Sequence, residues 1–105
     1  MTSDELYEIE RELRRIVDRL TSMPLDRAAT ATADCEQAAQ LLLAQTRLLT
    51  DDIPADARIP MLGPQGLGAM IAVLGRDYLN AAHASEASDP SPVLDALVTL
   101  RRALP

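Results

Sequence analysis

The chain has 105 residues, close to the commonest size of a single domain, and 48% of them are hydrophobic. Its formal net charge is −6, its pI is about 4.6, and all ten of its lysine-plus-arginine positions are arginine. This charge argues against nucleic-acid binding, which depends on neutralising phosphates, and only Tyr7 and Tyr78 offer rings on which bases could stack.

The composition predicts an all-α protein. Alanine, leucine, glutamate and arginine are abundant and lose little side-chain freedom in a helix, whereas the β-branched and aromatic residues that suit strands are sparse. We expect residues 1–105 to form one small domain that resembles a four-helix bundle. The first fifteen residues lack the apolar region of a secretory signal and the single Cys35 excludes an internal disulfide, so a cytoplasmic protein is expected.

Residues 2–23 carry the most regular helical pattern in the chain. Apolar residues recur at alternating steps of three and four, which places them on one face of a helix. They are Leu6, Ile9, Leu13, Ile16, Leu20 and Met23. This seam suits the core of a bundle better than an independent coiled coil, but both interpretations leave open a dimer through it. The first five members of this seam, Leu6 to Leu20, are therefore candidates for an interaction face. Glu8 and Glu12 are expected on the polar face of the helix.

A second helical region follows Pro24, which removes an amide donor and should end or kink the first helix near Met23. One continuous helix over residues 24–49 competes with a shorter helix that begins with Asp34 as its N-terminal cap. We favour the single helix, because its alanine-rich start is a good helix former and no residue forces a break.

Residues 50–64 form the longest expected connection, and Pro54, Pro60 and Pro64 interrupt any helix there. This segment contains four apolar residues, which a mobile lid would leave exposed. They therefore favour an ordered strap that packs on the end of the bundle. They are Ile53, Ile59, Met61 and Leu62. The aspartates of this segment lack the glycine and the terminal glutamate of a calcium-binding loop. The chain also has only one histidine and one cysteine, so no metal site is expected.

A glycine-rich stretch opens the next helix, residues 64–83. The spacing of its glycines matches neither a phosphate-binding loop nor the dinucleotide fingerprint, and no strand is expected before it. The uncharged run is too short to span a membrane. We expect instead a central, buried helix. On it, Gly68, Ala72 and Gly75 form a flat face for another helix, of this chain or of a second copy, and they join the candidate interaction face.

The final helix is expected over residues 92–104, after a polar linker at residues 83–92. Ser91 can cap this helix and Pro92 fits its first turn. Its apolar face comprises Val93, Leu97, Leu100 and Leu104. The segment therefore supplies one more amphipathic helix to the core.

The favoured function is a non-enzymatic helical module that binds a protein partner or a second copy of itself, with no cofactor and no catalytic residue. A small-ligand site near the start of helix 64–83 is the first alternative. A small enzyme that uses His83 and nearby carboxylates is the second. The candidate ligand-site residues are Gly66, Gly68, Arg76, Asp77, Tyr78 and His83. No nucleic-acid or membrane partner is expected.

Overall fold

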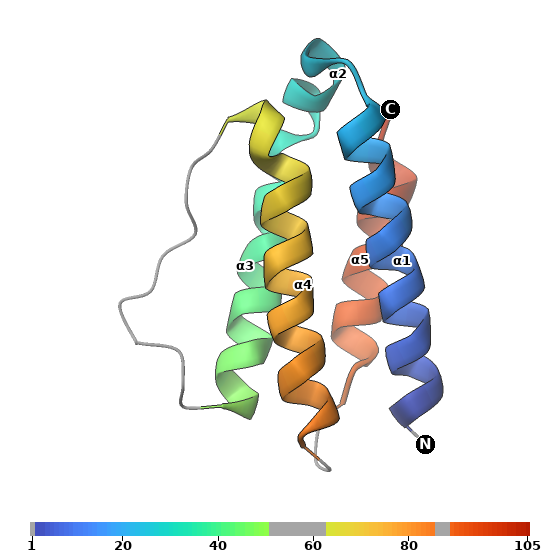
Figure 1. Cartoon of the computed structure of the whole chain (residues 1–105), viewed down its shortest axis with the longest axis vertical. Coiled ribbons are helices and arrows are strands. Elements are labelled where there is room, and N and C mark those ends of the chain that lie inside the picture. The colour runs from blue at the N-terminus through green and yellow to red at the C-terminus, as the bar shows by residue number, and fades with distance from the viewer. Residues whose placement is uncertain (1, 51–62, 86–88) are drawn as a thin grey trace.

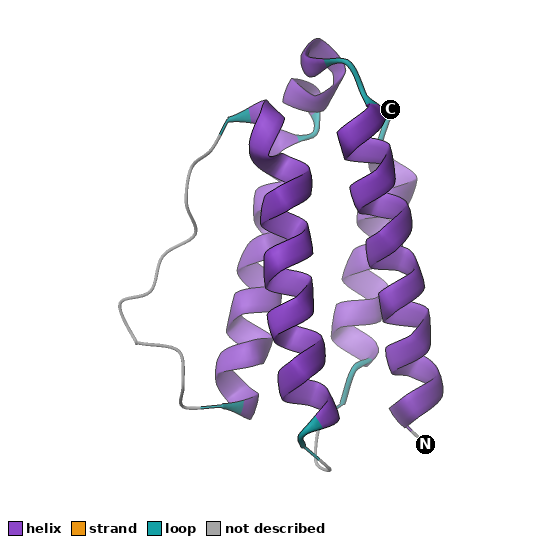
Figure 2. Ribbon diagram, in the orientation of Figure 1, coloured by secondary structure: helices purple, strands orange, loops and turns teal. Residues whose placement is uncertain are grey.

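The computed structural model describes residues 2–50, 63–85 and 89–105. The helices, in chain order, are α1 (Thr2–Ser22), α2 (Leu25–Thr30), α3 (Thr32–Leu49), the 3₁₀ helix η1 (Pro64–Gly66), α4 (Leu67–His83) and α5 (Ser91–Ala103). These residues contain no strand (Figure 2), so the all-α prediction is confirmed. The Pro-rich strap expected within residues 50–64 falls mainly on 51–62, which lie outside the described residues.

The four long helices lie side by side, with α1 and α5 running in one direction and α3 and α4 in the other (Figure 1). α4 packs against α1 and α3, and α5 packs against the same two helices. The expectation that the helix over residues 64–83 is central is therefore wrong. α4 is one of four neighbouring helices, and its Val73 is 60% exposed.

The predicted seam of α1 lies in the core of the chain. Leu6, Ile9, Leu13, Ile16 and Leu20 expose between 0% and 7% of their surface. They belong to one apolar cluster that also draws on α2, α3, α4 and α5, for example through Leu42, Ile71 and Leu97. Burying one large aliphatic side chain contributes about 1.5–3 kcal/mol, so this seam is a principal source of stability within the single chain.

Small residues on α4 allow that helix to approach α1 closely. A Cβ atom placed on Gly75 would lie 2.6 and 2.7 Å from the two methyl carbons of Leu13. A Cβ on Gly68 would lie 3.7 Å from the Cβ of Leu20 and 3.1 Å from the hydroxyl of Thr21. The two glycines are seven residues apart, as are Leu13 and Leu20, so they meet α1 at matching positions. The helix that packs on this flat face therefore belongs to the same chain.

The single helix expected over residues 24–49 is instead two helices that meet at Ala31. The amide of Ala31 donates to the carbonyl of Ala28 at 3.0 Å, and its φ and ψ of −94° and 0° depart from helical values. The hydroxyl of Thr30 donates to the carbonyl of Arg27 at 2.6 Å.

Contacts distant in sequence account for this break. α2 turns across the end of the molecule and packs against η1 (Figure 1), and Ala28 and Ala31 are buried. These contacts outweigh the high helix propensity of the alanine run. The alternative start at Asp34 is also wrong, because Ala31 precedes the first residue of α3 and no side chain caps that helix.

Candidate functional site

The candidate interaction face is almost entirely covered in the folded chain. The five seam residues of α1 are buried, as are Gly68 and Gly75, and Ala72 is partly buried. Gly68 and Gly75 lie against α1. A partner could reach this face only if α1 and α4 separated, so a binding surface has to be sought elsewhere on the fold.

The candidate ligand-site residues are not brought together. Gly66 and Gly68 are buried at the start of α4, whereas His83 is exposed at its end, about 22 Å along the helix axis. Arg76 and Asp77 are exposed, but Tyr78 faces the core. Among the described residues, no ion pair includes His83. These positions therefore do not form one site.

Tyr78 is the largest fully buried side chain of the core, with 1% of its surface exposed. Its hydroxyl has no hydrogen-bond partner within the described residues. Burial raises the pKa of this phenol, and the nearby negative charges of Asp89 and Glu5 raise it further. The ring therefore contributes apolar packing, while its hydroxyl is neutral and unpaired.

Cys35 is also fully buried, on α3. Burial, reinforced by the charges of Asp34 and Glu36, raises the pKa of its thiol from 9.0 to about 11. A thiolate is the nucleophilic form of cysteine, and a thiol with this pKa is almost entirely protonated at neutral pH. Cys35 is thus a packing residue in the folded chain.

The described ranges, 2–50, 63–85 and 89–105, hold neither a metal site nor a membrane-spanning helix. No group of three or more histidine, cysteine, aspartate or glutamate side chains is placed there to hold a metal ion. No helix there has both the length and the apolar character needed to cross a membrane.

An open groove runs between α3 and α5 and has a volume of about 640 Å³. Ala38 and Leu100, which expose 6% and 3% of their surface, form its floor. Leu41 and Ala96 are half-buried beside them. The other lining residues are Asp34, Gln37, Gln40, Asp95, Thr99 and Ala103. The groove thus combines an apolar floor, made largely of small side chains, with a polar rim.

The rim of this groove is acidic. Asp34 and Asp95 are both exposed, and none of the described residues that line the groove is basic. Sequence reasoning did not locate this groove. The pairing of α3 with α5 decides its position, and no sequence pattern specifies that pairing.

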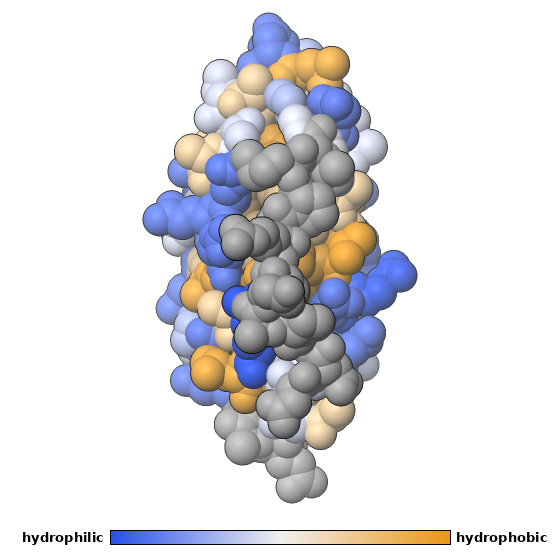
Figure 3. All heavy atoms as spheres, turned by 90° about the vertical axis from the view of Figure 1, so that its left-hand side faces the viewer, coloured by the Kyte–Doolittle hydropathy of each residue, from blue (hydrophilic) through white to orange (hydrophobic). Residues whose placement is uncertain are grey.

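Among the described residues, the large apolar side chains that are exposed outside the groove lie singly on the fold. Tyr7, Leu25, Leu48 and Val73 are each at least 60% exposed, and each comes from a different helix. On the side of the molecule shown in Figure 3, hydrophobic and hydrophilic side chains are interspersed. Isolated exposed apolar residues are normal in globular proteins. The α3–α5 groove is therefore the better candidate for a binding surface.

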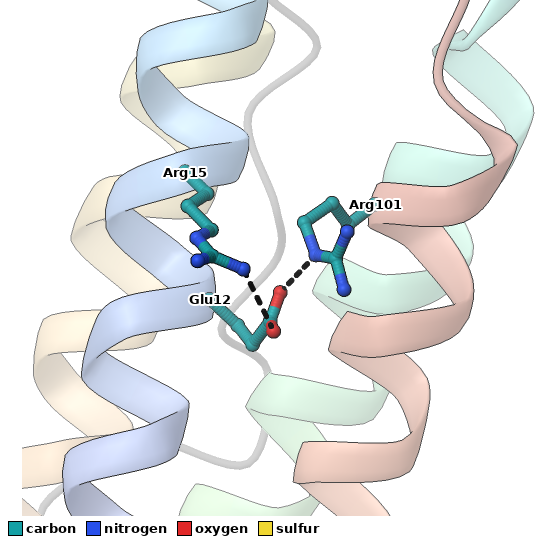
Figure 4. Close-up of polar contacts among 3 residues, drawn as sticks. All are labelled: Glu12, Arg15 and Arg101. Atoms are coloured by element: carbon teal, nitrogen blue, oxygen red, sulfur yellow. Dashed lines mark hydrogen bonds and ion pairs between the residues drawn. The ribbon is translucent and has the colours of Figure 1, made fainter.

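A polar stripe on α1 joins that helix to α5. Glu5 accepts a hydrogen bond of 3.0 Å from the hydroxyl of Ser91. Two turns further along α1, the carboxylate of Glu12 accepts a hydrogen bond from Nε of Arg101. Nη1 of Arg15 lies 3.9 Å from the other oxygen of the same carboxylate (Figure 4). Glu12 is only 5% exposed, so its expected place on the polar face of the helix is wrong. Glu5 and Glu12 are seven residues apart and thus lie on one edge of α1.

Comparisons with known proteins do not identify a family. No protein-family model matches the chain, and searches of curated proteins and of solved structures each find no match. The function of the chain has therefore to be inferred from its own residues.

Proposed function

We propose that this protein is a non-enzymatic interaction module whose α3–α5 groove binds an amphipathic helix of a basic partner protein. The observation that carries this proposal is the open apolar groove lined by Ala38, Leu41, Ala96 and Leu100. A groove between two helices commonly receives the apolar face of a third helix. Small side chains at positions 38, 96 and 103 leave room for the larger apolar residues of the bound helix.

Charge complementarity supports a basic partner. Asp34 and Asp95 flank the apolar floor, and the chain has a net charge of −6. Lysine or arginine residues beside the apolar face of the bound helix would meet these carboxylates. A second copy of this chain is a poorer occupant, because a two-fold interface through this groove sets the same acidic rim against itself.

We infer that α1, α3, α4 and α5 form a four-helix bundle and that residues 1–105 are one domain. One apolar cluster with members from all five α-helices supports this inference. We further propose that the protein works in the cytoplasm, since a single buried cysteine suits a reducing compartment.

The test uses a fluorescein-labelled amphipathic helical peptide of 18 residues, with leucine on one face and lysine on the other, in an anisotropy titration. Asp34→Arg is expected to weaken binding at least about fivefold, because it sets a cation against lysine. Asp26→Arg is the matched control, since Asp26 is also an exposed aspartate in the first turn of a helix but lies outside the groove. Ala96→Phe, which fills the groove, should also weaken binding.

Other outcomes would count against the proposal. Equal affinity of the wild type, Asp34→Arg and Ala96→Phe would place the peptide elsewhere. Equal binding of a peptide with glutamate in place of lysine would remove the argument from charge. A concentration-dependent dimer in analytical ultracentrifugation, abolished by Ala96→Phe, would make a second copy the occupant instead.

A further inference from the structure

Four arginines from three helices line a second open groove, at the end of the molecule where α1 ends and α2 begins. They are Arg15 and Arg19 of α1, Arg27 of α2 and Arg101 of α5. Asp18 and Ser22 also line the groove, whose volume is about 650 Å³. Sites for small ligands typically have volumes of about 300–1,000 Å³.

The local charge of this groove is opposite to that of the whole chain. Four of the ten arginines gather there, although the net charge is −6. Among the described residues, Asp18 also lines the groove, Glu12 contacts Arg15 and Arg101, and an oxygen of the C-terminal residue Pro105 accepts a hydrogen bond from Arg19. Like charges that face a shared opening repel one another and attract anions from solution. An anion bound in the groove would relieve this repulsion.

Buried Glu12 fixes the orientation of Arg101. It accepts a hydrogen bond from Nε of Arg101, and both Arg15 and Arg101 reach toward it from facing helices (Figure 4). The Nη groups of Arg101, whose side chain is 28% exposed, are not engaged by this bond. A guanidinium held in this way is preorganised to bind an oxyanion with its outer edge. Glu12 would therefore be a positioning residue.

The other two arginines extend the donor set. Arg19 donates through one Nη group to the main-chain oxygens of Leu104 and Pro105, at 3.4 and 2.6 Å. Arg27 is exposed, and none of the ion pairs within the described residues includes it. Its guanidinium can therefore bind a ligand without breaking a contact of the fold.

We propose that this groove binds an anion that carries a phosphate group. Phosphate oxygens accept hydrogen bonds from several directions at once, which suits donors from α1, α2 and α5 better than the planar acceptor set of a carboxylate. The phosphate could belong to a soluble metabolite or to a lipid headgroup, and both present the same chemistry to the arginines. This site is separate from the α3–α5 groove and shares no lining residue with it.

The experiment measures the melting temperature with sodium pyrophosphate, and with sodium chloride at equal ionic strength. A parallel arm measures how much protein sediments with phosphatidylcholine vesicles that either contain or lack phosphatidic acid. Wild type should bind pyrophosphate, phosphatidic acid, or both, and Arg27→Gln should weaken that binding about tenfold, since it removes a charge-assisted hydrogen bond. Arg14→Gln is the matched control, because Arg14 is an arginine of α1 that is 68% exposed, pairs with Glu10 and lies outside the groove.

The outcomes separate the alternatives. Binding in only one arm identifies the source of the phosphate and supports the proposal. Equal effects of pyrophosphate and chloride, with no selective vesicle binding, would mean that the arginines only stabilise helix ends, and the proposal would be overturned. An equal loss of pyrophosphate or vesicle binding in Arg27→Gln and Arg14→Gln would also overturn the proposal. Asp34→Arg should leave pyrophosphate binding unchanged, so this proposal can fail independently of the proposed function.

Discussion

The contact between Gly75 and Leu13 gives a sharp test of the packing of α4 on α1. Gly75→Ala adds one methyl group, whose carbon would lie 2.6 and 2.7 Å from the methyl carbons of Leu13. Carbon atoms in favourable contact are about 3.5–4.0 Å apart, so the overlap is about 1 Å. Leu13 is 7% exposed and lies within the core, so it cannot move without disturbing its neighbours.

Two opposing effects set the magnitude. Overpacking a well-packed core typically costs about 1–3 kcal/mol. Replacing glycine by alanine inside a helix contributes about 1 kcal/mol of stability in return. We expect Gly75→Ala to destabilise the fold by about 1 kcal/mol, which lowers the melting temperature by about 5 °C in a chain of this length. Gly68→Ala should instead be neutral or stabilising, since the closest atom it meets is the hydroxyl of Thr21, whose side chain is exposed.

The assay is urea denaturation of a double-mutant cycle monitored by circular dichroism. Leu13→Ala removes the methyl groups that the new carbon meets, so in that background Gly75→Ala should stabilise the protein through helix propensity alone. Whether Gly75→Ala raises or lowers the free energy of unfolding therefore depends on the side chain at residue 13. If Gly75→Ala stabilised the wild type as much as Gly68→Ala does, the close approach of the two helices at this point would be refuted.

Three further predictions follow from buried polar groups. The pKa of the Cys35 thiol is about 11 in the folded state and ordinary in the unfolded state, so its contribution to stability is complete below pH 9 and is lost as the pH rises through 11. The melting temperature of the wild type should fall more between pH 9 and 11 than that of Cys35→Ala, and equal falls would contradict the raised pKa. Tyr78→Phe removes a buried hydroxyl that has no partner in the described part of the chain, and it should be neutral or stabilising by up to about 1 kcal/mol in urea denaturation. A clear loss of stability would mean that the hydroxyl has a partner. Arg101→Met leaves the carboxylate of Glu12 buried without its main partner and should cost about 1–3 kcal/mol. Adding Glu12→Gln should recover part of that loss, and no recovery would refute the pairing.

The sequence predicted those features that depend on local pattern. The α-helical class, the end of the first helix before Pro24 and the amphipathic face of α1 all follow from propensity and spacing. The flat face of Gly68 and Gly75 also predicted a closely packed helix, although the pattern did not say to which chain that helix belongs. Only the folded structure shows that this helix is α1 of the same chain.

The features that depend on contacts between distant residues could not be predicted in this way. The break at Ala31 arises because α2 packs against η1, and nothing local in an alanine-rich run signals that contact. Glu12 appears polar and exposed by its spacing, yet Arg101, 89 residues further along the chain, holds it in a buried position. Both grooves likewise depend on contacts between distant segments, since residues from two or three helices line each of them.

An NMR titration can show whether the α3–α5 groove receives a basic amphipathic helix. The leucine–lysine peptide is added to ¹⁵N-labelled protein, and amide shifts are followed residue by residue. We expect the largest shifts at the groove residues Gln37, Leu41, Ala96 and Thr99, with little change along the arginine-lined groove. Shifts centred on α4, or none at saturating peptide, would contradict this expectation.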